Sequence, residues 1–174
     1  VFTFDPAEYG ADGLAPIGRP DFYPIVSSHS LASMLHKKAN GSVQGFVVEG
    51  PSAGGHNAPP RAKNVLDEVG QPVYGERDAA DLEKIAEIGL PFWLAGSYGS
   101  PEGLERAKEQ GAAGIQVGTL FAYSRESGIT DDMKETVLEK VKAGRAVVFT
   151  GPLASPTGFP FKVVEIPGTA SEES

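Results

Sequence analysis

The sequence contains no cysteine, which excludes disulfide frameworks, thiolate metal sites and cysteine nucleophiles at once. Positive charge is also scarce: 15 Lys and Arg stand against 23 Asp and Glu, a net charge of −8. Binding to nucleic acid or to an anionic membrane surface is therefore not expected. The sequence contains no run of about 18 apolar residues, so no membrane span is predicted, and no signal-peptide pattern is present. We expect a cytoplasmic protein that acts on a small molecule.

Several chemical signatures are missing as well. Neither GxGxxG nor GxxxxGK[ST] occurs, so a standard dinucleotide fold or a P-loop is not indicated. Ser52 and Ser97 lack the nucleophile-elbow pattern, which argues against a serine hydrolase. No cluster of His, Asp and Glu has metal-ligand spacing, so we expect no metal.

The composition is that of one ordinary globular domain, 40% hydrophobic and 22% charged over residues 1–174. Residues 1–20 are rich in Gly and Pro, and we expect a loop or the remnant of a preceding unit there. Residues 168–174 are polar and predict a flexible tail. The chain begins with the apolar Val1 rather than Met, so we expect a fragment, a processed chain or a trimmed one.

Apolar strand patterns alternate with helix patterns along the chain. Strands are predicted at 22–27, 43–49, 91–95, 113–117 and 146–149, with further candidates at 74–75 and 161–166. Helices are predicted at 30–40, 78–88 (capped by Asp78), 100–111 and 130–143, with a short candidate at 62–69. This alternation predicts an α/β protein with a parallel sheet, either a barrel or an open doubly wound sheet. A complete eightfold barrel usually needs about 250 residues, so about five strands and four or more helices predict a partial one.

Three predicted strand ends carry glycine-rich loops, at residues 54–56, 96–99 and 118–119. Free amides and a helix N-terminus in such loops favour an anion such as phosphate, although each loop alone is also typical of an ordinary turn. His56 follows two glycines and is our candidate for proton exchange near neutral pH. His29 is a weaker candidate for ligand contact, and His36 lies among helix-surface lysines.

A further polar candidate is Gln116, at the end of a predicted strand. Its amide can donate and accept, so it suits the edge of a polar heterocycle. The alternative is a strand amide satisfied by neighbouring backbone.

Three motifs in sequence resemble the nitronate monooxygenase family, also called 2-nitropropane dioxygenases, and the related flavin-dependent enoyl-ACP reductases. They are Glu49-Gly50-Pro51-Ser52-Ala53-Gly54-Gly55-His56, Leu94-Ala95-Gly96-Ser97-Tyr98-Gly99, and Gly114-Ile115-Gln116-Val117-Gly118-Thr119-Leu120-Phe121, with Glu126-Ser127 after the last. The resemblance implies an FMN-binding (β/α)₈ barrel of TIM type, of which this chain is the C-terminal portion.

The resemblance also assigns site residues. His56 is implied to be catalytic. The residues implied to bind FMN are Glu49, Ala53, Gly54, Gly55, Ala95, Gly96, Ser97, Gln116, Val117, Gly118 and Thr119. Two positions depart from the family pattern: Ser97 replaces a second glycine and Val117 replaces a common methionine.

The activity implied by the resemblance is FMN-dependent oxidation of alkyl nitronates or nitroalkanes with O₂, if the missing first strands complete the barrel. One alternative is another flavin reaction on the same scaffold, such as enoyl-ACP or quinone reduction with NAD(P)H. Another is a non-catalytic half-barrel, which would form a homo-oligomer or pair with a missing half because its open sheet edges favour association.

Overall fold

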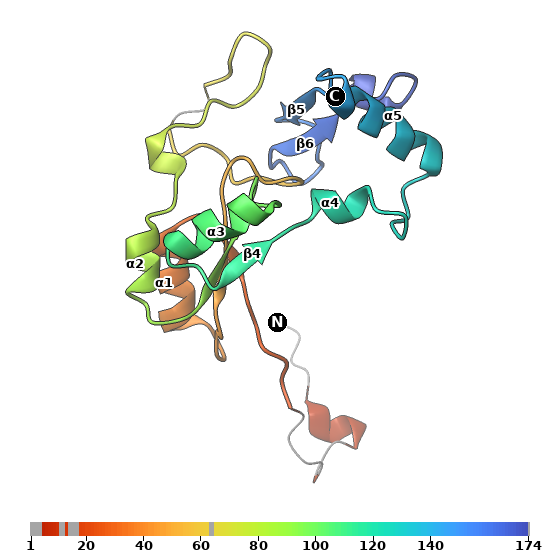
Figure 1. Cartoon of the computed structure of the whole chain (residues 1–174). Coiled ribbons are helices and arrows are strands. Elements are labelled where there is room, and N and C mark those ends of the chain that lie inside the picture. Colours follow the sequence, from red (N-terminus) through yellow and green to blue (C-terminus); the bar gives the residue numbers. More distant parts are fainter. Residues whose placement is uncertain (1–4, 11–12, 14–17, 63–64, 174) are drawn as a thin grey trace.

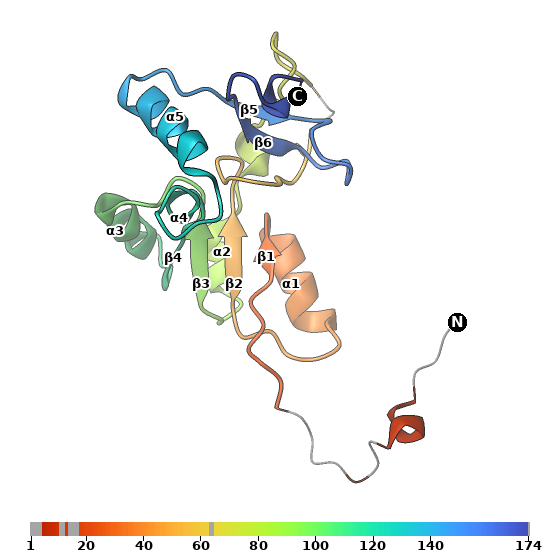
Figure 2. The ribbon, with the colours of Figure 1, turned by 90° about the vertical axis from the view of Figure 1, so that its right-hand side faces the viewer.

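Figure 1 shows the whole chain, and Figure 2 shows that four parallel strands lie side by side in the order in which the chain forms them. They are β1 (Ile25–Val26), β2 (Phe46–Glu49), β3 (Phe92–Ala95) and β4 (Gly114–Gln116). A doubly wound sheet reverses its strand order at a switch point, whereas a barrel does not. The unreversed order therefore favours the barrel over the open sheet.

The structure is a computed structural model and describes residues 5–10, 13, 18–62 and 65–173.

Helices connect the strands, and a polar side chain caps each of the first three. The helices are α1 (His29–Lys38), α2 (Leu82–Ala86), α3 (Pro101–Glu109), α4 (Thr119–Ala122) and α5 (Asp131–Lys142), with the 3₁₀ turns η1 (Pro6–Tyr9), η2 (Glu76–Asp78) and η3 (Ala170–Glu173). The side chains of Ser28, Asp81 and Ser100 accept hydrogen bonds from the open first turns of α1, α2 and α3. None of the described helices is long and apolar enough to cross a membrane.

The core lies between the sheet and the helices α1 to α3. Phe46 and Phe92 from the strands meet Ala32, Ile85 and Ala107 from the three helices, and all five are buried. The opposite face of the sheet carries a shallow cavity of about 580 Å³, lined by Tyr23, Val47, Trp93, Ile115, Gln116 and Val117. A parallel sheet with helices on one face and an apolar second face is compatible with part of a (β/α)₈ barrel, in which the second face would form the interior.

The last two strands form a separate antiparallel hairpin of β5 (Val148–Gly151) and β6 (Phe161–Val164). The expectation that 146–149 continues the parallel sheet was therefore wrong. A parallel crossover needs a dozen or more residues and usually a helix, whereas only the Gly- and Pro-containing loop 152–160 separates these strands. Figure 2 shows the hairpin beyond the carboxyl ends of β1 to β3, toward which their arrowheads point.

Other local predictions also differ from the structure. The strand expected at 22–27 is confined to β1, which begins directly after Pro24, a residue with no N–H to donate. Residues 74–75 form no strand. The helix expected at 62–69 is absent from the described residues 65–69, which form a turn closed by the hydrogen bond from Val73 N–H to Val65 O. The Asp67 side chain accepts from two N–H groups in this turn and so competes with a helix.

Asp78 does not cap α2, because Asp81 takes that position. Asp78 instead accepts hydrogen bonds from the backbone N–H groups of Gly75 and Arg61. Burial alone would raise the pKa of Asp78, but these hydrogen bonds and the charges of Arg61 and Arg77 hold it below its usual value. Asp78 therefore ties η2 to the loop that follows β2.

Candidate functional site

Three loops at the carboxyl ends of β2, β3 and β4 line one cavity of about 580 Å³, which we call the glycine cleft. Every residue to which the sequence analysis assigned cofactor binding lines this cleft, from Glu49 and the Ala53–Gly55 segment to Thr119. The other lining residues are Ser52, Tyr98, Gly99, Leu120 and Ala122. Parallel strands therefore bring the three motifs together at one edge of the sheet, as their spacing predicts.

The glycines of the cleft stand where the loops touch. A Cβ on Gly96 would lie 2.8 Å from the Ala53 nitrogen and 2.9 Å from Ser52 Oγ, and the φ of Gly96 is +93°. A Cβ on Gly54 would lie 3.2 Å from Thr119 Oγ1. Any larger residue at position 96 would push the first two loops apart.

The cleft offers many unused hydrogen-bond donors. In the part of the chain that the structure describes, the backbone N–H groups of residues 96–99 and 117–120 donate to no other group. The only charged lining residue is Glu49. Gly118 adds room, since a Cβ there would meet nothing within 4 Å. Clustered free amides at strand ends suit the oxygens of a phosphate ester.

Ser97 holds a conformation that L residues avoid. Its φ is +60°, and every other described residue with positive φ is a glycine. The side chain is exposed and makes no hydrogen bond to another described residue. The serine thus takes the backbone shape of the glycine that the family pattern has here, at the cost of left-handed strain.

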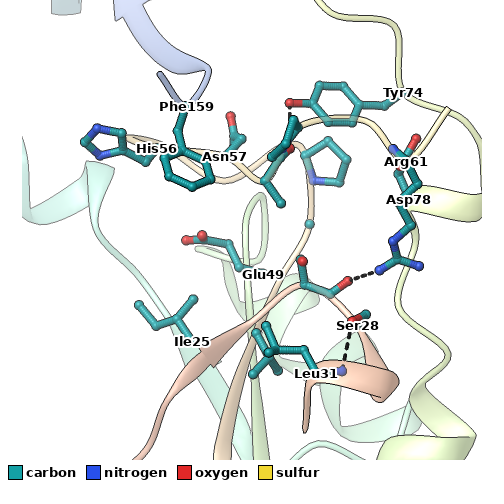
Figure 3. A pocket seen from close by; sticks show the side chains of 16 residues that line it. Ile25, Ser28, Leu31, Glu49, His56, Asn57, Arg61, Tyr74, Asp78 and Phe159 are labelled. Carbon is teal, nitrogen blue, oxygen red and sulfur yellow. Dashed lines mark hydrogen bonds between the residues drawn. The ribbon is translucent and has the colours of Figure 1, made fainter. Parts of the chain in front are cut away.

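His56 lies outside the glycine cleft. Its side chain is exposed and lines a neighbouring cavity of about 470 Å³, which we call the His56 cavity. Figure 3 shows the imidazole turned away from Glu49 and lying beside Phe159. Glu49 lines both cavities. His56 is therefore not brought into the cavity lined by the glycine loops, and the two spaces share Glu49.

The imidazole is held by the β5–β6 hairpin. His56 Nε2 lies 2.7 Å from Ser155 Oγ, and the ring packs edge-to-face on Phe161 with 4.7 Å between centroids. The Ser155 hydroxyl also lies 2.8 Å from Thr157 Oγ1. These contacts fix the orientation of the ring and connect it to a second hydroxyl.

Sequence reasoning missed the hairpin as part of the site. Lys162 N–H donates to Gly55 O at 3.0 Å, and Asn57 N–H donates to Pro160 O at 2.8 Å. The Gly-Gly-His loop therefore has backbone partners near β6. His56 and Ser155 are 99 positions apart, and no local pattern predicts such a pairing. The turn-forming residues of the Ser-Pro-Thr-Gly-Phe-Pro segment at 155–160 are the sequence signal that indicates an ordered loop here.

Polar groups also line the far side of the His56 cavity (Figure 3). The Arg61 guanidinium donates to Ser27 O at 2.9 Å and to Arg77 O at 2.7 Å. Asn57 is buried and donates from Nδ2 to Ala53 O at 3.1 Å, which leaves Oδ1 without a partner among the described residues.

The electrostatics of Glu49 follow from its position. Burial raises the pKa of its carboxyl group above the ordinary value of 4.5, since the charged form loses hydration between the two cavities. Raised carboxyl pKa values are common where protons are exchanged, although structural burial produces them too.

The other polar candidates from the sequence, Gln116, His29 and His36, differ in whether they line a cavity. Gln116 lines the glycine cleft, and its side-chain amide has no hydrogen-bond partner within the described ranges, so the backbone-satisfied alternative was wrong. His29 lies 3.3 Å from its neighbour Ser30 Oγ and lines neither cavity. His36 is exposed in the last turn of α1, as expected.

Comparison with known proteins agrees with the family that the three sequence motifs resemble. The family model for nitronate monooxygenase matches residues 20–153. A curated relative from Mycobacterium tuberculosis (strain ATCC 25618 / H37Rv), (3aS,4S,5R,7aS)-5-hydroxy-7a-methyl-1-oxo-octahydro-1H-indene-4-carboxyl-CoA dehydrogenase, is 28% identical over 123 residues, which are 71% of this chain and 31% of the relative. The protein of the same name from Rhodococcus jostii (strain RHA1) is 28% identical over 116 residues, 67% of this chain and 29% of the relative.

Solved structures resemble the chain as well. FabK from Thermotoga maritima, as its M276A mutant, superimposes with a TM-score of 0.57 and 25% identity over 84% of this chain and 41% of that one. The FabK structure without that mutation gives 0.56 and 24%, over 84% and 40%. The chain spans about a third of the curated relatives that it matches and about two fifths of the solved ones.

Relief of backbone strain at Ser97 gives a first prediction. A glycine at position 97 would relieve roughly 1–2 kcal/mol of left-handed strain in the folded state. Its greater flexibility would stabilise the unfolded state by roughly 0.5–1 kcal/mol. Ser97→Gly should therefore raise the free energy of unfolding by about 0.5–1 kcal/mol, as measured by urea denaturation. Ser97→Ala keeps a Cβ and should match the wild type. An equal gain in both variants would contradict strain at this position.

Glu49 gives a prediction on pH. Its pKa is raised in the folded state, so the folded chain holds an extra proton and this group costs stability as pH rises above about 4.5. Glu49→Gln removes that cost. The variant should gain stability relative to the wild type progressively between acidic and neutral pH, as followed by unfolding at several pH values. A difference that does not change with pH would show that burial of the carboxylate is not the cause.

Proposed function

Because the chain belongs to the nitronate monooxygenase family, we propose that it binds FMN in the glycine cleft and oxidises alkyl nitronates or nitroalkanes with O₂, with further strands completing the barrel. The observation that carries this proposal is the set of free backbone amides at 96–99 and 117–120, gathered around one cavity. A phosphate monoester is the ligand group that such amides suit best.

The residues present fit this cofactor. The amides of the two loops would hold the phosphate, and the missing Cβ atoms at Gly54 and Gly118 leave room for it. Gln116 would present its unpartnered amide to the polar edge of the ring system. When bound, FMN would supply the electron acceptor that no side chain of this sequence provides.

The His56 cavity would then receive the substrate, next to the cofactor. His56 would take a proton from the carbon acid or donate a hydrogen bond to a nitronate oxygen. We assign Nε2–H as the donor to Ser155 Oγ, with the Ser155 hydroxyl donating to Thr157. That assignment leaves Nδ1 free to exchange the proton.

A second candidate is a flavin reaction that uses NAD(P)H on the same scaffold. Its support is that the curated relatives are called dehydrogenases of a carboxyl-CoA compound. Oxidation of NAD(P)H by the FMN-loaded protein would favour this candidate, because nitronate oxidation needs no nicotinamide. A colourless protein that ignores added FMN would favour a non-catalytic half-barrel.

Filling the cleft tests cofactor binding. Gly118 has an ordinary negative φ of −112° and open space at its Cβ, so Gly118→Leu should fold normally and occupy the cleft. We expect FMN affinity, measured by quenching of flavin fluorescence, to fall at least tenfold. Gly128→Leu is the matched control, because Gly128 also has open space and lies outside the cleft. Equal affinities of the two variants would exclude the cleft as the flavin site.

Removing the imidazole tests the catalytic role. His56→Ala should lower kcat for a neutral nitroalkane by about 10²–10⁴-fold, the usual contribution of a general base, while FMN affinity stays within about twofold. His36→Ala, on the exposed side of α1, is the control and should keep full turnover. Unchanged kcat in the His56→Ala protein would remove His56 from the mechanism.

A further inference from the structure

Lys162 is a half-buried cation without an acidic partner. Its Nζ donates to Thr150 Oγ1 at 2.8 Å, and no carboxylate in the described ranges pairs with it. Burial lowers the pKa of the ammonium group, since nothing nearby compensates for its lost hydration. A cation in such a place gains free energy from any anion that comes within reach.

The Lys162 side chain lines a cavity that adjoins the glycine cleft. This cavity of about 330 Å³ lies between the hairpin, α5 and the Gly-Gly-His loop, and we call it the Lys162 cavity. Five residues line both it and the glycine cleft: Ser52, Gly54, Gly55, Thr119 and Ala122. The hydrogen bond from Lys162 N–H to Gly55 O, at 3.0 Å, fixes the backbone of the lysine against this shared wall.

The shared wall contains two glycines, Gly54 and Gly55. A Cβ on Gly54 would approach Thr119 Oγ1 to 3.2 Å, so a side chain there would crowd the contact between the two loops. The other lining groups of the Lys162 cavity are mostly apolar and include Val137, Val148 and Val164. The ammonium therefore finds its polar surroundings at Thr150 and along the shared wall.

The glycine cleft contains no cation to balance the charge of its proposed ligand. No Lys or Arg lines it, and its one charged residue is the carboxylate of Glu49. A phosphate monoester carries about −1.5 to −2 charges at neutral pH. Amide groups bind its oxygens but do not neutralise this charge.

We infer that Lys162 supplies the countercharge for a phosphate monoester in the glycine cleft, so that the β5–β6 hairpin selects a phosphorylated ligand over its unphosphorylated form. The inference rests on the proposed function in one respect, that the phosphorylated ligand is FMN. The ammonium would leave Thr150 and turn toward the shared wall, against which the Lys162 backbone is already held by its hydrogen bond to Gly55. Binding would then restore to the lysine the charge compensation that the free protein lacks.

Comparison of FMN with riboflavin, which lacks the phosphate, tests this inference. Dissociation constants of both flavins are measured by fluorescence quenching for the wild type, Lys162→Met, Lys162→Arg and Lys142→Met. We expect Lys162→Met to bind FMN at least tenfold more weakly and riboflavin within twofold of the wild type. Lys162→Arg keeps the charge and should bind FMN within about threefold. Lys142 is exposed at the end of α5, and its variant should bind both flavins as the wild type does.

Two results would overturn the inference: unchanged FMN affinity in Lys162→Met, or equal losses for FMN and riboflavin. Circular dichroism verifies the fold of each variant, and Lys162→Gln, which keeps a donor for Thr150, replaces Lys162→Met if the latter unfolds. If the wild type binds neither flavin, the proposed function fails, and inorganic phosphate then decides the inference. Broadening of the ³¹P signal by the wild type but not by Lys162→Met supports it, and no broadening by the wild type contradicts it.

Discussion

The site depends on the close approach of backbone from neighbouring strand ends. Gly96 lies so near the Ala53 backbone that no side chain fits between them, and a Cβ on Gly54 would make a tight contact of 3.2 Å with the Thr119 side chain. This contact is possible because β2, β3 and β4 are parallel and adjacent, so that their carboxyl ends meet at one edge. At this edge the backbone N–H groups of residues 96–99 and 117–120 donate to no other group in the described part of the chain.

The hairpin gives this edge of the sheet its second wall. Its hydrogen bonds to Gly55 and Asn57 hold the Gly-Gly-His loop, and Ser155 turns the His56 ring into the neighbouring cavity. Two adjoining spaces result, one lined by backbone amides and one by residues that include His56, Asn57 and Arg61. Glu49 lines both spaces, and its carboxyl group is partly buried between them. Such a division suits a cofactor in one space and its substrate in the other.

The sequence predicts the parallel sheet and the glycine cleft well, for a physical reason. Buried parallel strands such as Phe46–Glu49 read as apolar runs, and glycines such as Gly96 mark positions that tolerate no Cβ. Both signals are local. The antiparallel hairpin, the orientation of His56 and the placement of Lys162 depend on pairings between distant segments, which leave no periodic trace in one sequence. Asp78 shows the same limit. Its local pattern suits a helix cap, but its carboxylate accepts a hydrogen bond from the Arg61 backbone N–H, 17 positions earlier in the chain.

The central claim is that the loops after β3 and β4 bind the phosphate of a flavin through their backbone amides. Titration of the ¹⁵N-labelled chain with FMN, followed by amide NMR, tests it most directly. The account predicts the largest shifts at the amides of Gly96, Ser97, Gly118 and Thr119, with little change along α1. Shifts confined to other parts of the chain, or none at saturating FMN, would contradict it.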